Sequence, residues 1–173
     1  MSLAVPAPLH VHLRPPWQAY NYEYVRSRLA DPRLAAVGVA IQVFRAPLLA
    51  VPVGGCRRGG FFIVDDERIA LAVCDALWGQ PGFPSPRFRW APSPDHCYIV
   101  EWGETAPSGD TNARGRFYGY SDRAITDGRF DLPPLPGTDS GAASDSLSGQ
   151  SRADPPQHRD QPKRGLVHGA PAP

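Results

Sequence analysis

The chain has little cysteine and almost no lysine. Its three cysteines, Cys56, Cys74 and Cys97, are odd in number and widely spaced. This pattern matches neither a disulfide framework nor the paired-cysteine spacing of a zinc knuckle. We therefore expect three free thiols, no bound metal and no cofactor.

Long apolar runs and strong net charge are also missing. The longest uncharged stretches, residues 34–44 and 46–56, reach about half the length of a membrane span. The N-terminus has an early proline and no basic region, so it does not match a signal peptide. These features predict a cytoplasmic protein that does not contact membranes. The net charge of +1 argues against bulk attraction to nucleic acid, although a local basic patch remains compatible with it.

Aromatic residues stop after Phe130, and this divides the chain. Residues 1–16 contain four prolines and predict an irregular N-terminal arm, with a short extended piece at 9–13. Residues 17–130 predict one globular domain. Residues 131–173 are rich in Pro, Gly and Ser and predict a disordered tail, because they offer too little apolar surface to offset chain entropy.

Apolar periodicity predicts the elements of the domain. Apolar residues at helical spacing indicate a helix from residue 17 to about 29 and a short turn to 36. Alternating and apolar runs predict strands at 37–44, 48–53 and 61–64, with a flexible hairpin loop at 54–60. An acidic triplet starts a helix that runs through 77 and ends at Gly79.

The second half of the domain continues with strands. We expect them at 87–90 and 96–102, followed by a polar loop at 105–113, an extended piece at 117–120 and a closing helical turn from Ser121. The predicted fold is α+β: a small, mostly antiparallel sheet of about five strands, in the order α-β-β-β-α-β-β. Helices are expected to pack on one face of this sheet.

Several segments resemble a known family. They are residues 45–55, the Arg57-Arg58-Gly-Gly string, and residues 81–84, 100–104 and 115–121. In this order they are similar to an uncharacterised family of streptomycete proteins. The basic residues are nearly all Arg, which with 21 Pro and 17 Gly is typical of a high-GC, actinobacterial genome. The resemblance implies no catalytic or binding residue.

The glycine-rich loop at 54–60 is the first candidate site. Its glycines surround Arg57 and Arg58, so a mobile tip could place two guanidinium groups on phosphates. Ribbons of this kind enter DNA grooves. The alternative is an ordinary hairpin with solvated arginines.

A second candidate combines arginines with aromatic residues. Arg87 and Arg89 alternate with Phe88 and Trp90, and Arg116 precedes another aromatic run, a pattern that allows stacking on bases. The alternative is a set of core aromatics that alternate with solvated arginines. Nucleic acid is therefore one expected partner, and another protein is the second.

Catalysis has weaker support in the sequence. A small enzyme would need Glu101, Glu104, His96 and Cys97 gathered in one pocket. His10 and His12 provide only two metal ligands. Because no nucleophile–base pair or nucleotide loop is present, the sequence favours a non-catalytic binding or regulatory module. An exposed apolar patch would instead indicate a pure protein-interaction domain. The ligand and the oligomeric state stay open.

Overall fold

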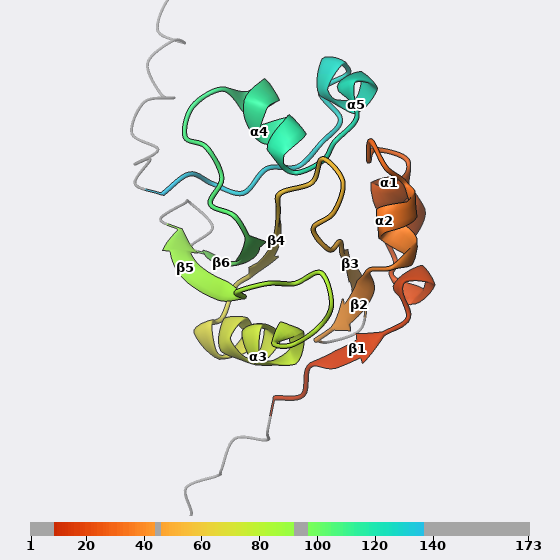
Figure 1. Cartoon of the computed structure of the whole chain (residues 1–173). Helices are drawn as coiled ribbons and strands as arrows, with labels where there is room; N and C mark the ends of the chain where they lie inside the picture. Colours follow the sequence, from red (N-terminus) through yellow and green to blue (C-terminus); the bar gives the residue numbers. More distant parts are fainter. Residues whose placement is uncertain (1–8, 44–45, 92–96, 137–173) are drawn as a thin grey trace, which may run out of the picture. The chain divides into compact units, whose positions relative to one another are not determined.

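The computed structural model describes residues 9–43, 46–91 and 97–136 (Figure 1). Within them, six strands form two antiparallel sheets of three strands each, ordered β1-β2-β3 and β4-β6-β5. The α+β class and the antiparallel pairing are therefore confirmed. The expectation of one sheet is corrected to two, because the chain passes from the first sheet to the second between β3 and β4.

The first sheet is built on the alternating segment near residue 40. Its strands are β1 (His12–Arg14), β2 (Val39–Gln42) and β3 (Leu48–Ala50). The register places Ile41 opposite both Leu13 and Leu48. Two strands thus fall where the sequence predicts them, in shorter form. β1 lies within the stretch expected to be an irregular arm, where an extended piece was predicted.

The second sheet shows why the predicted hairpin loop is wrong. Its strands are β4 (Gly59–Val64), β5 (Arg87–Ala91) and β6 (Cys97–Gly103). Gly59 and Gly60 belong to β4 rather than to a loop. Gly60 pairs with Trp102 of β6, and the indole ring lies against the position that a side chain would take. A Cβ at Gly60 would come within 2.2 Å of the Trp102 ring. The glycine therefore allows a buried tryptophan to pack on the strand.

The helices are mostly short. They are η1 (Pro16–Gln18), α1 (Tyr22–Arg26), α2 (Arg33–Ala36), α3 (Glu67–Leu77), α4 (Thr111–Phe117) and α5 (Asp122–Thr126). The predicted helix α3 is confirmed: the Asp66 carboxylate accepts a hydrogen bond from the Arg68 N–H at 2.8 Å, which caps its first turn. The closing turn predicted from Ser121 is confirmed as α5, where the Ser121 hydroxyl accepts from the Ala124 N–H.

Two local predictions are wrong. The single helix from residue 17 is interrupted, because the Tyr20 N–H donates to the Pro47 carbonyl at 2.8 Å instead of within a helix. The polar loop and extended piece at 105–120 contain α4. Its start is stabilised by Asp110, whose carboxylate accepts hydrogen bonds from the N–H groups of Asn112 and Ala113 at 3.1 Å each.

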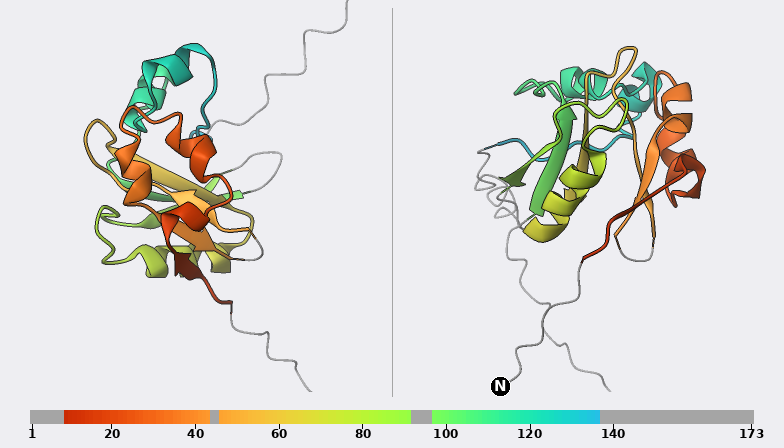
Figure 2. Two further views of the ribbon diagram at one scale, coloured as in Figure 1. Left: turned by 90° about the vertical axis from the view of Figure 1, so that its right-hand side faces the viewer. Right: turned by 60° about the horizontal axis from the view of Figure 1, so that its bottom comes forward.

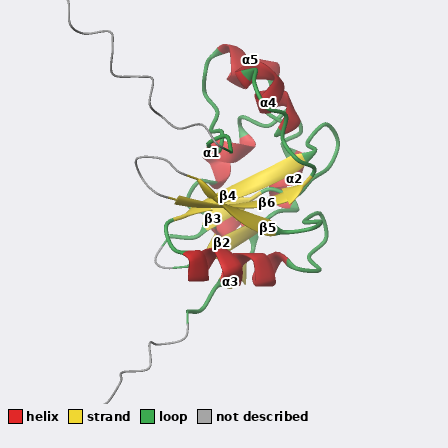
Figure 3. Cartoon of the chain, turned by 90° about the vertical axis from the view of Figure 1, so that its left-hand side faces the viewer, coloured by secondary structure: helices red, strands yellow, loops and turns green. Residues whose placement is uncertain are grey.

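Helical segments cover both faces of the second sheet, whereas the sequence predicts helices on one face only. Helix α3 packs on the face that carries Phe62, Val100 and Trp102. On the opposite face, the ring of Phe61 contacts Tyr118, the residue after α4, with centroids 5.0 Å apart. Figures 2 and 3 show α3 on one side of the strands and α4 with α5 on the other. The side chains of β4 are apolar on both faces of the sheet, so both faces have to be covered by other elements.

Residues beyond the predicted domain limits also take part in packing. β1 precedes residue 17, and Pro133, which is fully buried, follows residue 130. The limits 17 and 130 of a folding unit stay a prediction. Residues 137–173 of the predicted tail and residues 1–8 of the arm lie outside the described part of the chain. Within the described ranges, no helix has both the length and the apolar character that crossing a membrane requires.

Candidate functional site

Arg57 lies in the interior rather than at a loop tip. Gly54 and Arg57 form a tight turn, with reciprocal backbone hydrogen bonds of 3.0 and 2.9 Å. The Arg57 side chain turns inward, is 6% exposed, and donates to the carbonyls of Val51 and Tyr118. Burial lowers the pKa of Arg57 to about 10, which leaves it protonated at neutral pH. The exposed tip expected for this residue is not formed.

Arg58, its neighbour in the sequence, is exposed and paired. Its guanidinium contacts the Glu104 carboxylate through two nitrogens, with an Nε–Oε1 distance of 3.1 Å. This hydrogen bonding holds the pKa of Glu104 below its ordinary value and raises that of Arg58. Arg58 also lies 5.9 Å from the centre of the Phe117 ring. A phosphate would have to compete with Glu104 for this side chain.

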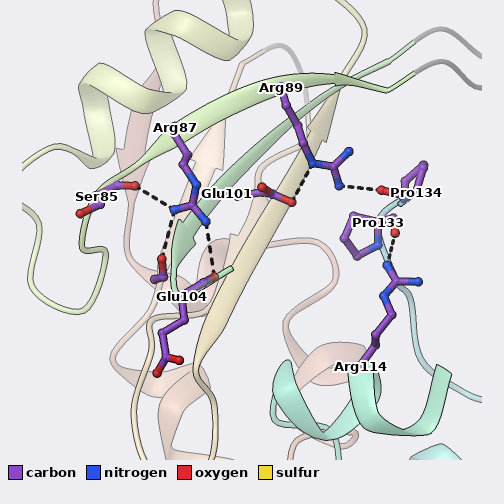
Figure 4. A network of polar contacts seen from close by, with 9 residues as sticks. Ser85, Arg87, Arg89, Glu101, Glu104, Arg114, Pro133 and Pro134 are labelled. Atoms are coloured by element: carbon purple, nitrogen blue, oxygen red, sulfur yellow. Dashed lines mark hydrogen bonds and ion pairs between the residues drawn. The ribbon is translucent and has the colours of Figure 1, made fainter. Parts of the chain in front are cut away.

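The two arginines of β5 are also engaged (Figure 4). Arg87 donates to the carbonyl of Gly103 at 3.0 Å and to that of Ser85 at 3.3 Å. Arg89 forms an ion pair with Glu101 at 3.0 Å, and its side chain is 22% exposed. Both arginines therefore hold neighbouring chain segments together.

Arg116 is the second exposed member of the predicted set. Its Nε lies 3.3 Å from the Asp122 carboxylate, and its side chain is 63% exposed. The structure does not gather the five predicted arginines into one surface. Each has a carboxylate or carbonyl partner, and Arg58 and Arg116 are the most exposed of them.

The residues of the enzyme hypothesis lie apart. Glu101 is paired with Arg89, and Glu104 with Arg58. Cys97 begins β6, about 13 Å along the strand from Glu101 at the usual rise per residue. His96 lies outside the described residues. Burial raises the pKa of the Cys74 thiol to about 11, so that thiol stays protonated.

His10 and His12 of the arm lie close to each other. The rings of His10 and His12 lie with centroids 6.0 Å apart. The described residues contain no group of three or more His, Cys, Asp or Glu side chains arranged to hold a metal ion.

A mainly apolar concave surface lies between the two sheets. Its volume is about 690 Å³, within the range of ligand sites. Among the residues that the structure describes, its lining includes two charged or reactive groups, Asp65 and Cys97. The other lining residues are Ile41, Val43, Ala46, Leu48, Phe62, Ile63, Val64 and Ile69.

A smaller hollow of about 250 Å³ adjoins it. Both hollows are lined by Leu48, Phe62 and Ile63, so they meet between β3 and β4. We call the two together the β3–β4 groove. Ile63 is 45% exposed and Leu48 is 39% exposed in its walls. The smaller hollow also includes the polar side chains of Asn21, Arg57 and Asp131. The groove is therefore an accessible, mainly apolar surface rather than a closed core.

One wall of this groove is the edge of β4, with which no described strand pairs. The Glu104 N–H donates to the Arg58 carbonyl at 3.0 Å, so Arg58 and Glu104 form a hydrogen-bonded pair. Such pairs alternate along an antiparallel ladder, and the register therefore makes Gly60 and Phe62 the next residues of β4 that bond to β6. The N–H and C=O groups of Phe61 and Ile63 consequently point away from β6. Among the described residues, none forms a hydrogen bond to these groups.

The facing edge of β3 is capped. The Leu49 N–H donates to the Asn21 side chain at 2.8 Å, and the Pro47 carbonyl accepts from Tyr20 at the same distance. Exposed strand edges promote pairing with other chains, and proteins commonly cover them. Here β3 is covered by the residues before α1, whereas no residue in the described ranges forms hydrogen bonds to the outer edge of β4 at Phe61 and Ile63. The sequence could not show this contrast, because it depends on which strands share a sheet.

The comparison with known protein families gives a match that covers most of the chain. A model of DUF6302, a family of unknown function, matches residues 13–163. The chain belongs to this family. The resemblance to an uncharacterised family is thereby confirmed, while its streptomycete origin stays a prediction. No curated protein and no solved structure matches the chain.

Proposed function

We propose that this DUF6302 domain is a non-catalytic protein-binding module that takes up an extended segment of a partner protein along β4. The observation that carries the proposal is the unpaired edge at Phe61 and Ile63, which lies between apolar walls. A strand edge offers alternating donors and acceptors that match an extended peptide backbone. This chemistry favours polypeptide over other ligands.

The groove also suits the side chains of such a segment. Alternate side chains of an added strand point to opposite faces of the sheet. One set would enter the larger hollow near Ile69, and the other the smaller hollow near Val51. Asp65 lies at the end of β4 beside the larger hollow and is exposed. The preferred segment is therefore apolar at alternate positions, with a basic residue close to Asp65.

The environments of the predicted arginines weaken the case for nucleic-acid binding. Arg57 is buried, and the other predicted arginines are occupied by groups of the same chain. The separation of Glu101 from Cys97 gives no support to an enzyme. An actinobacterial source and a cytoplasmic location accompany this proposal as predictions from composition.

Ile63→Pro tests main-chain pairing directly. Proline removes the outward N–H of residue 63, which β6 does not use, and edge positions tolerate proline. Peptides selected from a random display library with the full-length chain should show alternating apolar residues. Their affinity, measured by fluorescence anisotropy, should fall about fivefold in Ile63→Pro, since one hydrogen bond contributes about 1 kcal/mol.

Two controls separate the edge from its apolar surroundings. Ile63→Thr keeps the N–H and the strand propensity, so it should retain more affinity than Ile63→Pro. Leu71→Ser removes another exposed apolar side chain, on α3, and should bind normally. Equal binding by Ile63→Pro and wild type, or no enriched peptide, would contradict the proposal. A concentration-dependent dimer abolished by Ile63→Pro would instead make a second copy the occupant.

Nucleic-acid binding is a second candidate, favoured by the exposure of Arg58 and Arg116. If it occurs, the Arg58→Ala/Arg116→Ala double variant should reduce the slope of log affinity against log salt by roughly 2. Fluorescence anisotropy with a labelled duplex at several salt concentrations measures this slope. A slope unchanged from wild type would remove these two residues from any phosphate contact.

A further inference from the structure

Residues 131–136, here the proline segment, run along the second sheet and α4. Their sequence is Asp131-Leu-Pro-Pro-Leu-Pro136. Proline fixes its own φ and disfavours helix in the residue before it, so this sequence favours the polyproline II conformation. Pro133 is among the most completely buried side chains of the protein. The segment is therefore seated in a slot rather than lying loosely on the surface.

Two arginines from different elements hold its backbone (Figure 4). Arg114 of α4 donates through Nη2 to the Pro133 carbonyl. Arg89 of β5 donates through Nη2 to the next carbonyl, that of Pro134, at 2.6 Å. Backbone carbonyls in polyproline II make no internal hydrogen bonds, which leaves them available to such donors.

The electrostatics of this contact are unusual. Arg114 is 7% exposed, and no carboxylate within the described part of the chain forms an ion pair with it. Its Nε and the Nη1 of Arg89 are buried without a hydrogen-bond partner. A buried cation normally has an anionic partner. Arg89 has such a partner in Glu101, whereas the acceptor of Arg114 is a carbonyl of the proline segment. The Arg114 side of the site is therefore matched to a backbone rather than to an acid.

We propose that Arg89, Arg114 and the slot filled by Pro133 form a recognition site for proline-rich segments, occupied in this structure by the chain's own residues 131–136. The expected partner is another protein that carries a similar Leu-Pro-Pro segment, which would bind by displacing residues 131–136. Recognition of polyproline II by fixed donors is an established mode of peptide binding. The arginines of this site belong to β5 and α4, whereas the groove proposed above lies along β4; the two adjoin at Asp131, which lines the smaller hollow.

A full-length chain whose own segment is weakened provides the test. The variant Leu132→Ser/Pro133→Ser/Pro134→Ser removes the apolar side chains that seat the segment, so the segment should leave the site more readily, and a labelled peptide of residues 129–136 serves as the probe. Fluorescence anisotropy should show saturable binding to this variant. Binding to the wild-type chain should be at least about tenfold weaker, since its own segment competes at high effective concentration. A probe with Ser in place of Pro133, or the added change Arg114→Gln, should abolish binding.

Several results would overturn the proposal. One is the absence of saturable binding to a segment variant whose circular dichroism matches wild type. Another is binding that ignores the Pro133 change in the probe. If the variant does not fold, the probe is titrated into the wild-type chain to millimolar concentration, and unchanged Nε–H resonances of Arg89 and Arg114 count against the site. A dimer formed by exchange of the segment between copies would rule out the separate partner.

Discussion

Replacing Arg57 by alanine is expected to destabilise the fold by about 3 kcal/mol, which is in the range of a broken buried polar contact. The change removes two hydrogen bonds, to the carbonyls of Val51 and Tyr118, and leaves a gap in the interior. The thermal midpoint should fall by about 10 °C for a domain of this size. Thermal unfolding followed by circular dichroism measures the change.

Arg58 provides the matched control, since it differs from Arg57 in environment but not in chemistry. Exposed ion pairs contribute little to stability, so Arg58→Ala should leave the midpoint close to wild type. Arg57→Met keeps the apolar stem and removes the donors, and should fall between alanine and wild type. Similar midpoints for Arg57→Ala and Arg58→Ala would contradict the interior role of Arg57.

These neighbouring arginines show what the sequence can and cannot predict. Both stand in one glycine-rich string, and local pattern gives them the same character. The turn at Gly54 directs Arg57 toward Tyr118, 61 residues later in the chain, and Arg58 toward Glu104. Such assignments depend on tertiary packing, which periodicity does not contain.

Elements with strong local signals were predicted well. Helix α3 has a capping carboxylate, Asp66, and apolar residues at helical spacing, and its predicted limits hold. Helix α4 was missed because its capping residue, Asp110, stands in a polar stretch that resembles a loop. The β3–β4 groove could not be predicted, since it exists only because β3 and β4 belong to different sheets. Local patterns thus predict the strands, α3 and the closing turn α5, while the candidate site arises from their arrangement.

Gly103→Ala is expected to destabilise the fold by about 3 kcal/mol or more, through backbone strain and a steric clash together. Gly103 ends β6 with φ of +81°, and its N–H donates to the Pro84 carbonyl at 2.8 Å. An added Cβ would lie 2.4 Å from the Arg58 carbonyl oxygen and 2.8 Å from a methyl group of Val53. The clash falls on backbone that joins the Gly54–Arg57 turn to β4, so the chain has little freedom to relax.

Gly79→Ala isolates the part of this effect that comes from backbone strain. Gly79 follows α3 with φ of +76°, close to that of Gly103, but a Cβ there would meet nothing within 4 Å. Its replacement should therefore destabilise by about 1 kcal/mol, the strain of a left-handed alanine alone. Urea unfolding of both variants gives the two free energies. Equal losses would show that the chain around Gly103 shifts to accept a methyl group, and that the junction between the turn and β4 is less tightly packed than the distances indicate.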